Sequence, residues 1–415
     1  MEEYFIYINL DGFGKYYFDL IDEPIKKLPF ISHLIKEGVY FENAYTGIPS
    51  ITFPMQCAIL SGTYSVGTHN CYQYWDRTSH QIIHQGRHND AETLGEILHR
   101  EEIEFIAIQQ FALENRGAER GNKKYLYIQP SGNYETRFNL LLQLIREHAV
   151  DMEEESYYYP ELPHVMFLYI DDLDAIGHNK DHYKTESKRI EAVQKRLIQI
   201  DEKLGEVIDA LKEKGIYDKT YILLTTDHGM MNFKGFSCVG KLKKALRRLG
   251  FKKVIARNTL EKDEEFDVLI LSTGIECQVY FKKIPRDLEQ IRQKLKQERY
   301  IEKILIKDDF KSKGITEKIG DMIISPQEGK HFNIEHRYIP TLSASHDSLN
   351  EKAQHIFSVL KGPRLKRGYT YEDRVKNIDF IPTITYLLGL PPLKNATGNL
   401  LLDLVEERIV GEEDR

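Results

Sequence analysis

Short apolar runs that end in aspartate are the most regular feature of the hydrophobic pattern. Three such runs occur: residues 4–10 lead into Asp11, residues 164–170 into Asp171, and residues 220–226 into Asp227. Runs of this length, bounded by turn signals, are typical of strands buried on both faces of a parallel sheet. Ligands of open α/β sheets bind beyond the carboxyl ends of the strands. We therefore expect the polar residues after these runs to meet at one edge of one sheet.

Strand-like and helix-like segments alternate through the first half of the chain. Further strands are expected at residues 39–45 and 104–108, and helices at 91–99, 137–148 and 187–213. The last helix carries apolar residues at steps of three and four, namely Ile190, Val193, Leu197, Ile200, Leu204, Val207 and Leu211. Such a stripe packs on a sheet. The alternation predicts an α/β fold with a mostly parallel central sheet and helices on both faces.

The composition of the chain changes after residue 230. Residues 231–335 are rich in Lys and Glu and show helical and strand-like segments without the earlier alternation. We interpret them as an inserted α+β lobe, with 1–230 and 336–415 forming the core. The charged helices of the lobe are either solvated faces or part of a lid that meets an anionic substrate. Within the returning core, a strand is expected at 356–360 and a helix at 380–388.

Composition and charge exclude several classes of protein. The net charge is −7 and the pI is about 6.1, which gives no indication of a stable nucleic-acid partner. The four cysteines form no CxxC pair, so neither a disulfide framework nor a structural zinc site is indicated. No stretch approaches the roughly 20 apolar residues of a membrane span. The acidic start of the chain does not match a signal peptide. We expect a cytoplasmic protein without a membrane partner, and its oligomeric state stays open.

The polar residues after the apolar runs have the character of metal ligands. Asp227 is followed at once by His228, and His178 follows Asp174 by four residues, which places both on one side of a helical turn. Carboxylates gathered at one sheet edge with Asp11 would repel one another unless a cation lay between them. Carboxylate and imidazole ligands suit zinc, with manganese as an alternative. The pattern therefore predicts a metal site with more ligands than one ion needs.

A threonine at the start of a predicted helix is a candidate nucleophile. Thr52 follows the second strand, and Pro54 suits the first turn of the helix that begins there. A helix N-terminus favours an anion. A threonine oxygen beside a divalent cation loses its proton readily and can attack phosphorus. The alternative is a threonine that only caps the helix. The nearby acid and histidine clusters favour the nucleophile.

Five motifs in order resemble a known family. They are Asp11, the segment P-S-I-T-F-P around Thr52, Asp174 with His178, the segment D-H-G-M from Asp227, and S-H-D around His346. In this order they are similar to the alkaline phosphatase superfamily, and most similar to its nucleotide pyrophosphatase/phosphodiesterase branch. The resemblance covers nearly the whole chain outside the inserted lobe, and it implies an alkaline-phosphatase-like fold.

The resemblance implies two divalent metal ions. Asp11, Asp227 and His228 would hold one ion, with the Thr52 oxygen as a further ligand. The second ion would be held by Asp174, His178 and His346. The implied enzyme is a two-metal phosphohydrolase that cleaves phosphodiester or nucleotide pyrophosphate bonds in a small-molecule substrate, through a phospho-threonine on Thr52.

Two departures from the family pattern bear on this assignment. Met55 stands where the family carries an asparagine that helps to bind a phosphoryl oxygen, so Gln56 or Asn70 would have to replace it. The nucleophile segment reads T-x-P-x-Q, whereas sulfatases need C/S-x-P-x-R, which disfavours a sulfatase. Two alternatives stay open. One is a phosphomonoesterase, phosphonate hydrolase or phosphomutase of the same superfamily, and the other is an inactive metal-bearing binding protein.

Several other polar residues are interpreted as structural. Asp171 and Asp172 are expected to be turn or cap residues. His331 and His336 lie where the lobe returns to the core, and we expect the lobe to supply no metal ligand.

Overall fold

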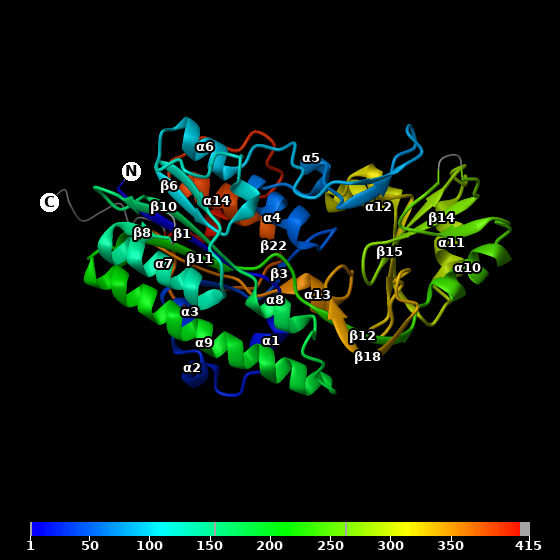
Figure 1. Cartoon of the computed structure of the whole chain (residues 1–415), viewed down its shortest axis with the longest axis horizontal. Coiled ribbons are helices and arrows are strands. Elements are labelled where there is room, and N and C mark those ends of the chain that lie inside the picture. Colours follow the sequence, from blue (N-terminus) through cyan, green and yellow to red (C-terminus); the bar gives the residue numbers. More distant parts are fainter. Residues whose placement is uncertain (1, 153–154, 262–263, 407–415) are drawn as a thin grey trace.

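A central eight-stranded sheet carries the fold (Figure 1). The computed structural model describes residues 2–152, 155–261 and 264–406. In spatial order the strands of this sheet are β21 (Tyr369–Tyr371), β2 (Val39–Phe41), β20 (Val359–Lys361), β11 (Thr220–Thr225), β1 (Tyr4–Leu10), β10 (Val165–Ile170), β6 (Phe105–Ile108) and β7 (Tyr125–Ile128). The sheet is mostly parallel, and β20 pairs antiparallel with both of its neighbours.

The register of the three central strands brings their ends together. Leu10 of β1 lies opposite Ile170 of β10, and Asn9 lies opposite Thr225 of β11. The residues that follow these strands therefore emerge at one edge, as the hydrophobic pattern predicts. All three strands are apolar and buried on both faces because helices cover both sides of the sheet.

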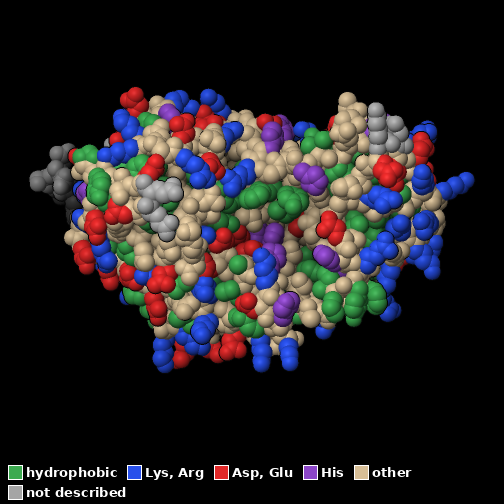
Figure 2. Space-filling model, in the orientation of Figure 1, with side chains coloured by type: hydrophobic (Ala, Val, Ile, Leu, Met, Phe, Trp, Pro, Cys, Tyr) green, Lys and Arg blue, Asp and Glu red, His purple; other side chains and the backbone are tan. Residues whose placement is uncertain are grey.

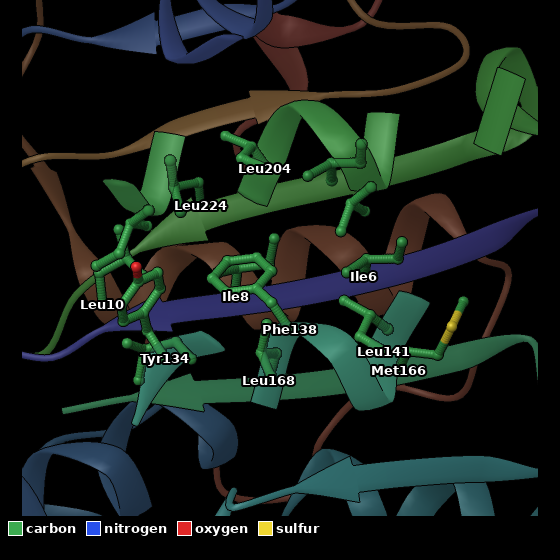
Figure 3. Packing of buried hydrophobic residues seen from close by; sticks show 14 of the residues in the cluster. Ile6, Ile8, Leu10, Tyr134, Phe138, Leu141, Met166, Leu168, Leu204 and Leu224 are labelled. Atoms are coloured by element: carbon green, nitrogen blue, oxygen red, sulfur yellow. The ribbon is translucent and has the colours of Figure 1, made fainter. Parts of the chain in front are cut away.

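Helices divide the core into two apolar layers. On one face Ile6, Ile8 and Leu10 of β1 pack against α3 (Pro29–Glu37), α7 (Tyr134–Glu147) and α9 (Glu186–Glu213), as Figure 3 shows for part of this layer. On the other face Phe5 and Tyr7 pack against α4 (Thr52–Ser61), α6 (Leu94–Arg100) and α14 (Phe380–Leu387). Successive side chains of a strand point to opposite faces, so one apolar run supplies both layers.

The inserted lobe has a sheet and an apolar cluster of its own. Its strands are, in spatial order, β13 (Val254–Ala256), β14 (Val268–Ser272), β15 (Cys277–Phe281), β17 (Met322–Pro326) and β16 (Ile301–Ile306). Helices α10 (Val239–Arg248) and α11 (Leu288–Leu295) pack on this sheet. Two antiparallel strands, β12 (Met231–Phe236) and β18 (Tyr338–Ser345), lead into and out of the lobe. The boundaries at residues 231 and 335 stay a prediction.

The lobe packs against the core through a hairpin made by β4 (Gln73–Trp75) and β5 (Ile82–His84). The Trp75 ring meets the Phe266 ring edge-on, with centroids 5.1 Å apart. Nη2 of Arg77 contacts both carboxylate oxygens of the buried Asp321, at 2.9 and 2.7 Å, and Nη1 donates to the Phe281 carbonyl oxygen at 3.0 Å. Apolar packing and charge-assisted hydrogen bonds together fix the orientation of the lobe.

The fold class expected from the sequence is confirmed, and the structure corrects its details. The strand expected at 39–45 is divided into β2 and β3 (Ala44–Tyr45), and the one expected at 356–360 into β19 (His355–Ile356) and β20. Strands β7, β16, β17 and β18 were not expected. Shorter elements that matter below are α8 (Asp172–Gly177), α12 (Lys307–Phe310), α13 (Glu351–Gln354) and β22 (Val375–Lys376).

In the part of the chain that the structure describes, no helix combines the length and apolar character needed to cross a bilayer. The cytoplasmic location stays a prediction.

Candidate active site

The structure brings all seven predicted site residues to the carboxyl edge of the central sheet. Asp11 follows β1, Asp227 and His228 follow β11, Asp174 and His178 belong to the turn of α8 after β10, His346 follows β18, and Thr52 is the first residue of α4. Figure 2 shows histidine and carboxylate side chains side by side near the middle of the visible face, between the core and the lobe. The assignment of these residues as metal ligands stays a prediction.

Thr52 points into this cluster rather than capping its helix. The N-cap of α4 is Ile51, and Thr52 is the first residue of the helix itself. Its Oγ1 lies 3.4 Å from Oδ2 of Asp11 and 3.2 Å from Nε2 of His228. The capping alternative is therefore wrong, and the hydroxyl lies among the predicted ligands of one ion.

The second predicted ligand set is equally compact. Oδ1 of Asp174 lies 3.2 Å from Nε2 of His178 and 3.9 Å from Nε2 of His346. The ligand atoms of these three residues all lie within 4.8 Å of one another, close enough to share an ion. The His346 ring stacks on the His228 ring at 3.7 Å, so the two sets adjoin.

Asp174 lies close to both sets. Asp11, Asp174 and His228 also offer ligand atoms within 4.8 Å of one another. Oδ2 of Asp227 is 3.8 Å from Nε2 of His228. The family pattern groups Asp227 with Asp11 and His228, whereas the compact group in this structure contains Asp174 in place of Asp227.

Unpartnered buried oxygens indicate that cations belong here. Oδ1 of Asp11, Oδ1 of Asp174 and Oδ2 of Asp227 are buried and accept no hydrogen bond from any described residue. A buried carboxylate oxygen without a partner is costly, and metal coordination is one of the few ways to satisfy it. The donor set of carboxylates and imidazoles therefore fits divalent metal ions.

The histidines present the same ring nitrogen to the cluster. Each has its Nδ1 at hydrogen-bonding distance from a backbone carbonyl oxygen: Ala344 at 2.8 Å for His178, Ser50 at 2.7 Å for His346, and Gly229 at 3.1 Å for His228. When Nδ1 donates its proton to a carbonyl, Nε2 keeps a free lone pair. The backbone thus holds three imidazoles in the tautomer that binds a metal.

The electrostatics of the site point the same way. Burial lowers the pKa of His228 to about 4 and the pKa of His346 to about 3, so both rings are neutral near pH 7. Burial, followed by the charges of Asp227 and Asp174, raises the pKa of Asp11 well above its ordinary value. Neutral imidazoles are ready to bind a metal, and the crowded carboxylates need positive charge nearby.

Two supporting residues were not found from the sequence. The Tyr169 hydroxyl donates to Oδ2 of Asp11. Ser50 holds His346 twice, because its carbonyl oxygen faces Nδ1 and its hydroxyl donates to the His346 carbonyl oxygen at 2.9 Å. Tyr169 belongs to an apolar strand run, and the contacts of Ser50 cross nearly 300 positions, so no local signal reveals either role.

The structure decides between the residues considered as substitutes for the family asparagine. Met55 is 1% exposed and packs in the apolar layer beneath α4. Asn70 is fully buried, and its amide donates to the carbonyl oxygens of Gly86 and His88 at 3.0 and 2.7 Å. Gln56 is also buried, and its amide lies near Asp227. Burial raises the pKa of Asp227, and the Gln56 amide offsets part of this rise. Both N–H groups of the Asn70 amide are thus engaged, whereas Nε2 of Gln56 has no hydrogen-bond partner among the described residues.

Asp171 occupies the N-cap position of α8 without a capping hydrogen bond, and Asp172 lies in the first turn of that helix. Asp172 accepts from the Tyr134 backbone N–H at 2.8 Å and pairs with Arg196. Asp171 pairs with Arg137 at 2.8 Å. The groups of ligand atoms found among the described residues include neither His331 nor His336. The expectation that the lobe supplies no metal ligand stays a prediction.

Aromatic side chains line one side of Thr52. Phe53 is 37% exposed, and its ring meets the Phe111 ring edge-on at 5.1 Å. The Arg87 guanidinium lies over both rings, 5.5 Å from Phe53 and 4.8 Å from Phe111. An apolar face with a cation beside it therefore adjoins the candidate nucleophile.

Comparisons with known proteins agree with this geometry. The chain is 21% identical over 399 residues to bis(5'-adenosyl)-triphosphatase enpp4 of Mus musculus, covering 94% of this chain and 78% of the relative. Its fold is similar to human ectonucleotide pyrophosphatase/phosphodiesterase 5, with a TM-score of 0.69 and 16% identity over 98% of this chain and 100% of the other. It is also similar to an inactive form of the murine protein in complex with AMP, with a TM-score of 0.67, 15% identity, and coverage of 98% and 100%.

The family described as type I phosphodiesterase/nucleotide pyrophosphatase matches residues 5–348. This match spans most of the chain, so the chain belongs to that family and is a hydrolase of phosphodiester or pyrophosphate bonds.

Proposed function

We propose that this enzyme is a two-metal phosphohydrolase that cleaves phosphodiester or nucleotide pyrophosphate bonds through a phospho-threonine intermediate on Thr52. One observation carries the proposal. The three unpartnered buried carboxylate oxygens of Asp11, Asp174 and Asp227 lie in a cluster with imidazole Nε2 atoms, and the hydroxyl at the start of α4 lies 3.2 Å from one of these nitrogens, on His228.

The residues present would hold two ions. Asp11, Asp227 and His228 would bind one, together with the Thr52 oxygen, and Asp174, His178 and His346 would bind the other. When bound, the ions, zinc or alternatively manganese, would stabilise negative charge on the reacting oxygens and favour ionised hydroxyl groups.

The chain's own residues then determine the course of the reaction. The Thr52 Oγ1 forms a bond to phosphorus while the bond from phosphorus to the leaving oxygen breaks. Water hydrolyses the phospho-threonine in a second step, and Thr52 regains its proton. Because Thr52 begins α4, the helix N-terminus adds favourable potential for the phosphoryl anion.

The surroundings of Thr52 favour a nucleotide as substrate. Phe53 offers a partly exposed aromatic face directly after the nucleophile, and bases stack on such faces with about 1–3 kcal/mol per base. The structural neighbour bound to AMP supports a small-molecule nucleotide here as well.

Paired substrates test the reaction class. We expect kcat/KM to be higher for bis-p-nitrophenyl phosphate than for p-nitrophenyl phosphate, because the site should accept a substituent on each side of phosphorus. The opposite order would favour the phosphomonoesterase alternative. Phe53→Ala should raise KM for a purine dinucleotide more than for the nitrophenyl diester, since a purine base offers a larger stacking face than a nitrophenyl ring.

A further inference from the structure

A cavity of about 360 Å³ lies between the core and the lobe, apart from the metal-ligand cluster. Its lining includes residues of β3, of the segment after α12 and of β22. Its lining contains four basic side chains and one acidic side chain, namely Lys303, Lys313, Arg374, Lys376 and Glu351. None of the seven predicted site residues is part of it. Its volume is within the range of small-molecule sites, roughly 300–1,000 Å³.

The positive charge of the lining is not balanced by the protein. Among the described residues, Lys313, Arg374 and Lys376 form no ion pair. The nearest carboxylate oxygen to the Lys303 ammonium belongs to Glu302, at 4.0 Å. Ion pairs as long as this one contribute little.

The acidic residue of the lining is already engaged. The Glu351 carboxylate accepts a hydrogen bond from the Tyr45 hydroxyl, and its other close contact is Nδ1 of His355 at 3.7 Å. It therefore cannot neutralise four cations, and the cavity keeps a net positive charge.

Arg374 is held in place for binding. Its guanidinium lies 3.7 Å from the centroid of the Tyr45 ring, which in turn stacks on the His355 ring at 4.6 Å with an interplanar angle of 5°. Stacking fixes the plane of a guanidinium and leaves its N–H edge free for phosphate or carboxylate oxygens.

The cations come from both parts of the molecule. Lys303 lies on β16 and Lys313 on the short helix Lys311–Lys313 of the lobe, whereas Arg374 and Lys376 belong to the core. Buried apolar residues of both parts, including Ile48, Ile315 and Leu349, pack together beside them. Like charges that face each other across a packed interface repel, and an anion between them would relieve the repulsion.

We propose that this cavity binds a small polyanion that carries two or more phosphate or carboxylate groups. The anion is bound and not cleaved, because the predicted metal ligands lie outside the cavity. It joins the lobe to the core through charge-assisted hydrogen bonds from both sides.

Labelling with pyridoxal 5'-phosphate tests the proposal on the intact holoenzyme. The reagent carries a phosphate and an aldehyde, which condenses with a lysine amine to an imine with loss of water, and borohydride reduces the imine to a stable amine. Peptide mapping then reports each lysine. We expect Lys313 and Lys376 to react at least about fivefold faster than Lys311, an exposed lysine of the same short helix that does not line the cavity.

Protection experiments identify the ligand chemistry. Methylenediphosphonate should protect Lys313 and Lys376 but not Lys311. Tricarballylate, with three carboxylates, is the second competitor. If only the diphosphonate protects the lysines, the ligand carries phosphate groups. If only tricarballylate protects them, the ligand carries carboxylates. If both protect them, the site selects its ligand by charge.

A charge reversal supplies the matched control. Arg374→Glu should abolish the fast labelling and the protection, whereas Lys311→Glu should leave both unchanged. Equal labelling of Lys311, Lys313 and Lys376 without protection by either competitor would overturn the proposal and show ordinary surface lysines.

Discussion

Two groups of buried carboxylates in this molecule balance their charge in different ways. At the carboxyl edge of the central sheet, Asp11, Asp174 and Asp227 lie among imidazoles that point Nε2 at them. Where the lobe meets the core, Glu276 and Asp347 are each 1% exposed, and the Glu276 backbone N–H donates to the Asp347 carbonyl oxygen at 3.3 Å. Burial raises the pKa of Asp347 to about 7, and burial followed by the Asp347 charge raises the pKa of Glu276 well above its ordinary value.

The difference shows what buried carboxylates need. The first group has imidazole nitrogens and a hydroxyl beside it, so bound divalent cations would supply the missing charge. In the second group the raised pKa values of Glu276 and Asp347 favour protonated carboxyls, because a protonated carboxyl costs less free energy to bury than an ionised one. Burial of carboxylates alone therefore does not indicate a metal site, whereas burial together with oriented imidazoles fits one.

The largest loss of activity is expected from substitution of Thr52, the candidate nucleophile that lies beside the first group only. Thr52→Ala should fold and keep its metals but lose kcat/KM by about 10³-fold or more, as in other enzymes that lose a covalent nucleophile. Thr52→Ser should retain measurable activity, because the hydroxyl remains. Steady-state kinetics with bis-p-nitrophenyl phosphate measures both variants, and near-normal turnover of Thr52→Ala would reject the covalent mechanism.

A smaller effect is expected at Gln56, whose buried amide lies beside Asp227. Residues that orient metal ligands typically contribute 10–100-fold to metal affinity or activity. We expect Gln56→Ala to weaken metal binding by about tenfold, measured by competition with a chromogenic chelator.

Met55→Leu is the matched control for Gln56→Ala. It changes the neighbouring residue within the apolar layer and should leave metal affinity unchanged. If Gln56→Ala and Met55→Leu bind metal equally well, Gln56 does not support Asp227.

The smallest effect is expected at the second group of carboxylates, where the stability of the folded protein should depend on pH. The folded-state pKa of Glu276 is raised, so the folded protein holds this proton more tightly than the unfolded chain. Its contribution to stability is complete below the unfolded pKa of about 4.3 and is lost as the pH rises through the folded pKa. The pKa of Asp347 is about 7. The free energy of unfolding that the two carboxyls contribute should therefore fall as the pH rises from about 4 to about 7 or above.

Glu276→Gln should flatten this decline, because glutamine stays neutral at every pH. Thermal unfolding of both proteins between pH 4.5 and 8, about the range that these pKa values define, measures the difference. Glu317→Gln, at an exposed position of the lobe, should keep the slope of the unaltered protein. Parallel curves for the unaltered protein and Glu276→Gln would show that the pair does not hold a proton.

Much of the fold and the site could be predicted because their signals are local. An apolar run followed by aspartate reveals both a buried strand and the acidic side chain at its end, as at β1 and Asp11. The i, i+4 spacing of Asp174 and His178 can likewise be recognised in the sequence without any knowledge of the fold. The antiparallel orientation of β20 was not predictable, since a short apolar run does not encode its direction.

Contacts between distant segments explain the rest. The Nδ1 partner of His178 is a carbonyl oxygen of β18, at Ala344, which comes after the lobe in sequence. The Glu276–Asp347 pair joins the lobe to the segment after His346, and the cationic cavity combines lysines of the lobe with Arg374 of the core. Such pairings arise from tertiary packing, and one sequence carries no local pattern for them.

Metal content is the decisive measurement for the proposed two-metal site. Elemental analysis of protein purified without chelator should find about two divalent ions per chain, zinc or manganese. Their removal should abolish activity and lower the Tm, because metal binding favours the folded state. A protein that contains no transition metal, and takes up neither zinc nor manganese when they are added, would contradict the account.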